Sequence, residues 1–142
     1  MRNYALEQQI IELLDSYRKK LLPSCRSWTA VAASVDLSRN AVYDIINSEE
    51  DVKRDTVVLL GLALEMSLDD FLILYNYKGF VFRKGIYRDE ITCRFFKKAL
   101  YDHEEWGRRL IEGGEEPPFN YNKPIKEGCI CILSGNTPCP EL

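Results

Sequence analysis

Short apolar stripes with a spacing of three and four residues are the feature that most constrains what this chain can fold into. Over residues 4–22 one amphipathic helical face carries Leu6, Ile10, Leu13, Leu14, Tyr17 and Leu21. Pro23 follows, and proline cannot donate the backbone hydrogen bond of a helix interior and biases its predecessor away from helical angles. The pattern predicts a helix over residues 4–22 that ends at Pro23 and Ser24.

Two shorter stripes follow, with polar residues between them. The first predicts a helix over residues 28–35, after which Asp36 is a residue type that tolerates a left-handed turn. Ser38 is suited to accept a hydrogen bond from the exposed amides of a second helix, predicted over residues 39–47, as its N-cap. We therefore expect two short helices joined by a tight turn.

Two more helices are predicted before residue 80. The polar stretch over residues 48–55 indicates a loop, and residues 56–66 return to an apolar helical pattern. Ser67 suits an N-cap, and acidic residues in the turn after it are favoured by the helix dipole. This last helix is predicted to end before Gly79.

The remainder of the chain divides into a helical part and a part rich in helix breakers. Residues 80–89 indicate a loop with extended character, whereas residues 90–111 carry apolar side chains on helical spacing and predict one or two helices. Glycines and prolines recur from Gly113 onward. A chain of 142 residues, 46% hydrophobic, supports one core. We expect a domain over residues 1–80, a helical extension over 81–112 and an irregular or partly disordered tail over 113–142.

The segment over residues 31–46 carries the pattern of two short helices that cross steeply. Such a crossing needs a small residue where the backbones approach, a turn former and an apolar plug, and Ala32, Asp36 and Leu37 have these properties at suitable intervals. On the second helix Val42 and Ile45 are predicted to point inward. The residues predicted to face outward are Arg39, Asn40, Tyr43 and Asp44.

This segment, together with residues 62–72 (LALEMSLDDFL), resembles the Cro and phage-repressor (XRE-type) helix-turn-helix family over about a third of the chain. The family's turn glycine is replaced by Asp36. More narrowly, the chain is similar to a Firmicutes-like subgroup with a glycine and an aromatic residue after the last helix, here Gly79 and Phe80. The resemblance implies an all-α fold: a lambda-repressor-like five-helix bundle with a helix-turn-helix, plus a C-terminal helical extension and an irregular tail.

The resemblance also implies a transcriptional regulator that binds double-stranded DNA. Ser38 and the amides at the start of its helix would hold a phosphate, while Arg39 and Asn40 would read guanine and adenine in the major groove. The remaining residues in the expected DNA interface are Tyr43, which would also reach base edges, Lys53 and Arg54. A homodimer is expected because one recognition helix reads only a half-site, and the helix after Gly79 is the candidate dimer element.

Charge supports a second hypothesis. The net charge is −3, and acidic residues near DNA phosphates cost binding energy. Around the recognition helix these acids are Asp36, Asp44, Glu49, Glu50 and Asp51. The alternative is therefore a helix-turn-helix scaffold that binds a protein and not DNA, as an antitoxin, adaptor or defence-system component would.

A basic run lies further along the chain and has two interpretations. It comprises Lys78, Arg83, Lys84, Arg88, Arg94, Lys97 and Lys98. These residues would either contact phosphates flanking a DNA site or, as the favoured interpretation, form a solvated surface or ion pairs with the acidic segment near Glu104, Glu105 and Glu112.

Other function classes receive little support from the sequence. The chain has one histidine, no glycine-rich phosphate loop, no His-Glu-x-x-His motif and no nucleophile elbow, so we expect no enzyme and no cofactor. Cys129 and Cys131 lack zinc-site spacing, so no metal site is expected. No stretch approaches the roughly 20 apolar residues of a membrane span, and the first residues do not resemble a signal peptide. We expect a cytoplasmic protein with reduced cysteines.

Overall fold

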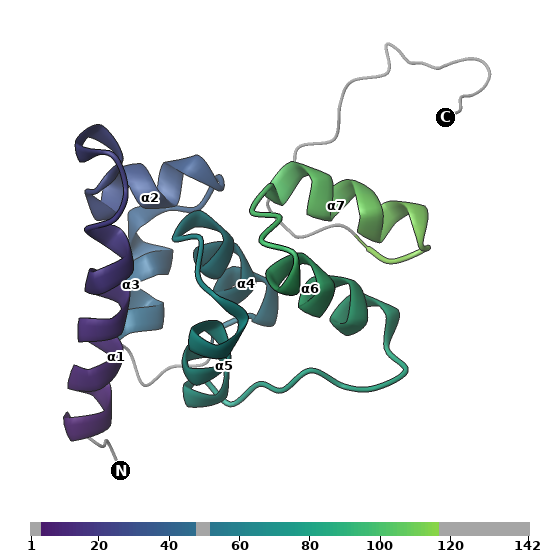
Figure 1. Ribbon diagram of the computed structural model, residues 1–142, viewed down its shortest axis with the longest axis horizontal. Helices are drawn as coiled ribbons and strands as arrows, with labels where there is room; N and C mark the ends of the chain where they lie inside the picture. The colour runs from purple at the N-terminus through teal and green to yellow at the C-terminus, as the bar shows by residue number, and fades with distance from the viewer. Residues whose placement is uncertain (1–3, 48–51, 117–142) are drawn as a thin grey trace.

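The computed structural model describes residues 4–47 and 52–116. Their regular structure is entirely helical, which confirms the predicted all-α class (Figure 1). The elements are α1 (Tyr4–Arg18), the short 3-10 helix η1 (Pro23–Cys25), α2 (Trp28–Ser34), α3 (Arg39–Asn47), α4 (Arg54–Ala63), α5 (Leu68–Tyr77), α6 (Tyr87–Lys97) and α7 (His103–Glu112). None of these helices combines the length and the apolar character that crossing a membrane requires.

The helix α4 lies at the centre of the bundle. All of its residues from Thr56 to Leu62 are buried, as expected for a helix that is apolar on every side. It packs against α2, α3, α5 and α7. Figure 1 shows α1 beside α3 on one side of α4, with α6 and α7 on the other. The exposed face of α3 and the extension therefore lie on different sides of the bundle.

Five helices in the described part of the chain end in the same way, with one residue at a positive φ angle. These residues are Asp36, Glu65, Gly79, Ala99 and Gly114, which follow α2, α4, α5, α6 and α7. In each case the next backbone amide reaches back to a carbonyl in the last turn, as when the amide of Met66 donates to the carbonyl of Gly61 at 3.1 Å. This is the Schellman closure, which satisfies carbonyls that a helix end leaves without partners.

Two of the predicted helices extend more than one residue beyond the C-terminal end that the structure gives them. The prediction that α4 continues to Met66 was wrong, because Glu65 takes a left-handed conformation at φ 56° and closes the helix at Ala63. The prediction that the first helix continues to residue 22 was also wrong, because the helix is four residues shorter. It ends at Arg18, after which tighter turns carry the chain to Pro23, with the amides of Lys20 and Leu21 bonding three residues back. Both corrections shorten an element without changing its place.

The predicted extension shares the core of the preceding helices. Ile91, Phe95 and Phe96 of α6 and Trp106 and Leu110 of α7 belong to the same buried cluster as the apolar residues of α1 to α5. The Trp106 indole donates a hydrogen bond to the Thr92 hydroxyl at 2.9 Å. Residues 90–111, for which one or two helices were predicted, are divided by a turn at Ala99. Of the predicted tail, residues 117–142 lie outside the described residues.

Candidate nucleic-acid interface

The turn between α2 and α3 is built as the sequence predicts. Asp36 adopts φ 60°, a left-handed conformation that short polar residues tolerate better than most. The amide of Leu37 donates to the carbonyl of Ala32 at 2.9 Å, and the Leu37 side chain is buried in the core as the apolar plug. The hydroxyl of Ser38 accepts a hydrogen bond from the amide of Ala41 at 3.1 Å, which confirms its role as the N-cap of α3.

The helix α3 has one apolar face and one polar face. Val42 and Ile45 are fully buried, so the inward face is the predicted one. Arg39, Asn40 and Tyr43 are all exposed, and the Arg39 guanidinium lies 5.8 Å from the centre of the Tyr43 ring. Three of the residues predicted to contact DNA therefore share one solvent-facing surface. We call Arg39, Asn40 and Tyr43 the α3 face.

The other two predicted DNA contacts, Lys53 and Arg54, lie where α4 begins and differ from one another. Lys53 is exposed and precedes the first turn of α4. The Arg54 guanidinium is instead engaged inside the chain. Its Nη1 donates to the Tyr75 hydroxyl at 3.0 Å and to the carbonyl of Val81 at 2.9 Å, and it lies over the Phe80 ring at 4.8 Å. We therefore do not include Arg54 in the α3 face.

No protein-family model, curated protein or solved structure matches this chain. The resemblance to the helix-turn-helix regulators therefore stays a prediction. The local geometry of α2, α3 and the residues around them is the basis for the functional argument.

The Arg54 contacts form part of a polar cluster that the sequence did not reveal. The buried carboxylate of Asp89 lies 4.0 Å from the Arg54 guanidinium, and it accepts hydrogen bonds from the Arg83 amide at 2.8 Å and from Arg83 Nε at 2.7 Å. Burial acts to raise the pKa of the Asp89 carboxyl, but the hydrogen bonds from Arg83 outweigh it and the pKa lies below its ordinary value. Burial raises the pKa of Tyr75 to about 12.

The basic run forms ion pairs, and one of them, Arg88 Nη1 with Glu115 at 3.7 Å, reaches the acidic segment three residues after Glu112. Arg83 pairs with Asp89, and Arg88 pairs with Asp55 at 2.6 Å. The carboxylates of Glu105 and Glu112 are bound within α7 by Arg108, and Glu105 also by Arg109. The predicted pairing is therefore confirmed for Arg88 and Glu115. Glu105 and Glu112 instead pair within α7, because residues three and four apart on one helix are close neighbours.

A contact from the extension reaches the turn of α2 and α3. The Nε2 atom of His103, at the start of α7, lies 3.2 Å from a carboxylate oxygen of Asp36. The hydroxyl of Tyr101, two residues earlier, donates to the carbonyl of Met66 at 2.9 Å. The start of α7 is therefore held against the turn before α3 through Asp36, and the residues before it against the turn between α4 and α5 through Met66.

Two further predictions concern residues on α6 and in the tail. The candidate dimer element is α6, and its large apolar side chains Phe95 and Phe96 are buried in the core of their own chain. A dimer that uses α6 would have to form through its exposed polar side chains. The cysteines considered as metal ligands, Cys129 and Cys131, lie outside the described residues.

Proposed function

We propose that this protein is a cytoplasmic transcriptional regulator that reads the major groove of double-stranded DNA with α3. The observation that carries the proposal is the α3 face. It presents one guanidinium, one amide and one phenol from the first five residues of a capped helix whose opposite side is buried. Side chains near the start of a recognition helix are the ones that reach base edges in such docking geometries.

Each group on the α3 face has a matching chemistry in DNA. A guanidinium pairs in a bidentate manner with guanine, and a carboxamide pairs with adenine. The Ser38 hydroxyl accepts the Ala41 amide and keeps its own hydrogen for donation to a phosphate oxygen. The amides at the start of α3 add a partial positive charge for the same phosphate. Because one α3 reads a half-site, the proposal includes a homodimer on a roughly palindromic site.

The decisive experiment is selection of bound sequences from random duplex DNA with the full chain, at low and at near-physiological salt. The proposal expects an enriched palindromic site that persists at the higher salt. The Arg39→Ala/Asn40→Ala variant should lose this preference, because each base contact contributes about 1–3 kcal/mol of discrimination. Its helical circular dichroism should be unchanged, since both side chains are exposed.

A matched control separates base reading from the loss of one positive charge. Lys98→Ala removes an exposed cation that follows α6, on the other side of α4 from α3. This control should weaken binding to all sequences slightly and keep the preferred site. An Arg39→Ala/Asn40→Ala variant that still selects the original site would refute the base-reading role of α3.

One observation favours a second candidate function, a protein-binding scaffold without DNA affinity. Asp44 is exposed on α3, and the chain as a whole has a net charge of −3. An acidic side chain next to DNA phosphates costs binding energy, whereas a basic protein surface would accept it. Absence of any enriched sequence at either salt, together with co-purification of a protein that Asp44→Lys releases, would support this alternative.

A further inference from the structure

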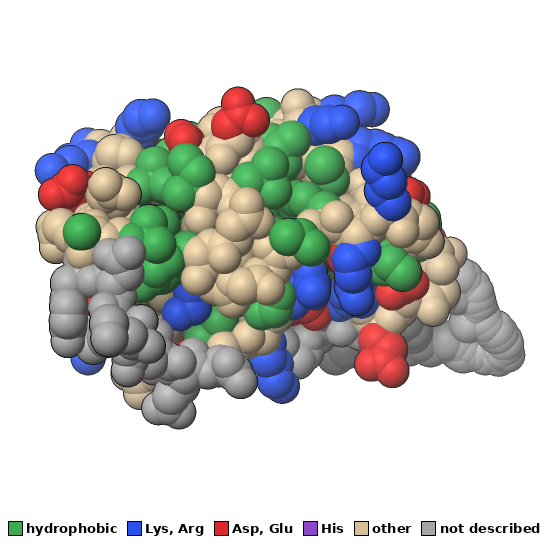
Figure 2. Space-filling model, turned by 90° about the horizontal axis from the view of Figure 1, so that it is seen from below, with side chains coloured by type: hydrophobic (Ala, Val, Ile, Leu, Met, Phe, Trp, Pro, Cys, Tyr) green, Lys and Arg blue, Asp and Glu red, His purple; other side chains and the backbone are tan. Residues whose placement is uncertain are grey.

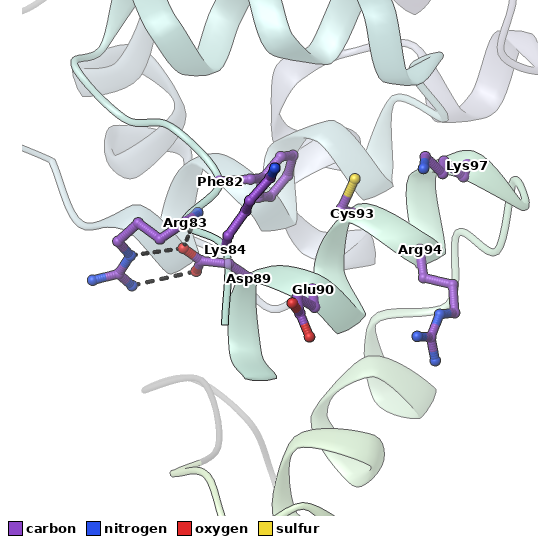
Figure 3. A pocket seen from close by; sticks show the side chains of 8 residues that line it. All are labelled: Phe82, Arg83, Lys84, Asp89, Glu90, Cys93, Arg94 and Lys97. Atoms are coloured by element: carbon purple, nitrogen blue, oxygen red, sulfur yellow. Dashed lines mark hydrogen bonds and ion pairs between the residues drawn. The ribbon is translucent and has the colours of Figure 1, made fainter. Parts of the chain in front are cut away.

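An open cleft lies between the loop that precedes α6 and one side of α6 itself. Its volume is about 500 Å³. Figure 3 shows Phe82 and Lys84 of the loop on one side, with Cys93, Arg94 and Lys97 of α6 on the other. The α6 residues recur at intervals that place them on one face of the helix. We call this feature the α6 cleft.

The charges of the α6 cleft are unbalanced. Four cations line it against two carboxylates. Arg83 and Asp89 neutralise each other through the hydrogen bonds that Figure 3 marks. The other carboxylate, Glu90, accepts a hydrogen bond from the Gly85 amide at 3.0 Å.

Three cations of the cleft form no ion pair with a carboxylate in the described part of the chain. The side chains of Lys84, Arg94 and Lys97 make neither a hydrogen bond nor an ion pair with any residue in the described ranges. Figure 2 shows Lys and Arg side chains at both ends of the face that it presents, including the end where α6 lies. An excess of positive charge in a concave site attracts an anion, even on a chain whose net charge is −3.

The apolar part of the cleft comes from Phe82. This side chain is half-buried, and its ring packs against Tyr75 with ring centres 4.9 Å apart. The ring is therefore held by the core while it lines the cleft. A rigid aromatic wall beside cations suits a ligand that has a flat apolar part next to its anionic group.

The dimensions and position of the cleft favour a small ligand over a macromolecule. A volume of about 500 Å³ lies within the range of roughly 300–1,000 Å³ that small-molecule sites occupy. The α6 helix packs against α5 and α7, whereas α3 packs against α1, α2 and α4. In Figure 1 the two helices lie on different sides of α4. DNA seated on α3 would therefore not extend over a continuous surface into the α6 cleft.

We propose that the α6 cleft binds a small ligand that carries a phosphate-type anion next to a flat apolar ring. Lys84 and Lys97 supply the positive charge that contacts the anion, and Phe82 supplies the apolar contact. Arg94, whose guanidinium points away from Lys84 in Figure 3, adds to the positive field of the cleft without contacting the anion. This ligand site is separate from the α3 face, and its existence does not depend on DNA binding by α3.

The test is a titration of the uniformly nitrogen-15-labelled full chain, followed by amide NMR spectra. The three probes are adenosine monophosphate, adenosine and inorganic phosphate. Adenosine monophosphate should shift amides in residues 82–97 with a dissociation constant in the micromolar to low millimolar range. Each of the other probes, which has only the ring or only the anion, should bind at least ten-fold more weakly.

Variants distinguish a built site from general charge attraction. Lys84→Gln/Lys97→Gln should weaken the binding of adenosine monophosphate at least ten-fold. Lys98→Gln is the matched control, because it removes the next cation along the chain, which does not line the cleft. Its affinity should stay within two-fold of the unmodified chain. Circular dichroism of all variants should be unchanged, since these lysines are exposed.

Three results would overturn the proposal. The first is that adenosine monophosphate at 10 mM shifts no amide signal of residues 82–97. Another is equal weakening by Lys98→Gln, which shows attraction to general surface charge. The third is a response of these amides to random-sequence duplex DNA but not to adenosine monophosphate, which assigns the cations to a nucleic-acid backbone.

Discussion

The carboxylate of Asp55 accepts two hydrogen bonds from the guanidinium of Arg88, from Nε at 3.2 Å and from Nη2 at 2.6 Å. The residues next to these two in the chain form a second ion pair, in which Arg54 Nη1 lies 4.0 Å from the carboxylate of Asp89. Arg54-Asp55 at the start of α4 and Arg88-Asp89 at the start of α6 are therefore paired crosswise. The arginine of each dipeptide interacts with the aspartate of the other. This relationship ties the predicted extension to the central helix by charge as well as by apolar packing.

Breaking the pair of Asp55 and Arg88 should destabilise the fold. Both side chains are less than one-fifth exposed, so removal of one leaves a poorly solvated charge. Asp55→Asn or Arg88→Gln should each cost about 2 kcal/mol in urea unfolding. The matched control is Arg108→Gln, whose ion pairs on α7 are half-exposed and should contribute little. A double-mutant cycle with no coupling between Asp55 and Arg88 would contradict this expectation.

Asp89 should make the stability dependent on pH in the acid range. Its pKa in the folded chain is below the ordinary value of about 3.9, so the unfolded chain binds the proton more readily. The stabilisation is therefore present above about pH 4 and is lost as the pH falls through the folded pKa. The difference in unfolding free energy between the unmodified chain and Asp89→Asn should shrink between pH 6 and pH 3. Parallel stability curves for the two proteins would exclude this role.

Gly61 should not tolerate a side chain, although it lies in the middle of α4. A Cβ atom added there would lie 2.4 Å from Cδ1 of Phe71 and 2.9 Å from Cζ of Phe96, and both rings are buried and stacked on one another. Gly61→Ala should therefore cost about 1–3 kcal/mol despite alanine's better helix propensity.

A compensating substitution tests the steric cause at Gly61. Phe71→Val removes the two ring atoms nearest to the added methyl group, because valine has no atom beyond Cγ. If crowding is the cause, the Gly61→Ala/Phe71→Val variant will be less destabilised in urea unfolding than the sum of the two single variants. Additive losses would show that the cost of Gly61→Ala arises elsewhere.

Local chemistry explains which parts of the fold could be predicted. Asp36, Ser38 and Ser67 act within a few residues of themselves, and the structure gives each of them its predicted turn or cap. The end of α5 was predicted because Gly79 is a recognisable left-handed residue. Glu65 and Ala99 take the same conformation without being residue types that favour it. The apolar residue after each of them, which accompanies a Schellman closure, is the signal that reasoning on residue type overlooked.

Long-range pairing explains most of what could not be predicted. The exposure of Arg39, Asn40 and Tyr43 followed from helical spacing alone. The inward position of Arg54 depends on Tyr75 and Val81, which are 21 and 27 residues away, and no local pattern encodes such a separation. The α6 cleft could not be predicted for the same reason, because it depends on contacts between residues far apart in the sequence. The cations of the basic run were visible in the sequence, but the packing of α4 and α6 decides which of them Asp55 and Asp89 neutralise, and so which of them remain to line the cleft.

Ala99 offers a test of the strain at these helix ends. It lies at φ 55°, and a left-handed conformation costs a residue with a Cβ atom roughly 1–2 kcal/mol. Ala99→Gly should relieve this strain, while the greater freedom of glycine in the unfolded chain offsets part of the gain. The net expectation is a stabilisation of about 0.5–1 kcal/mol in urea unfolding. Ala33→Gly, at an exposed position within α2, should instead destabilise by about 1 kcal/mol. Because the two substitutions are chemically identical, opposite signs would trace the difference to backbone conformation, and a loss of stability at Ala99 would show that its φ angle carries no strain.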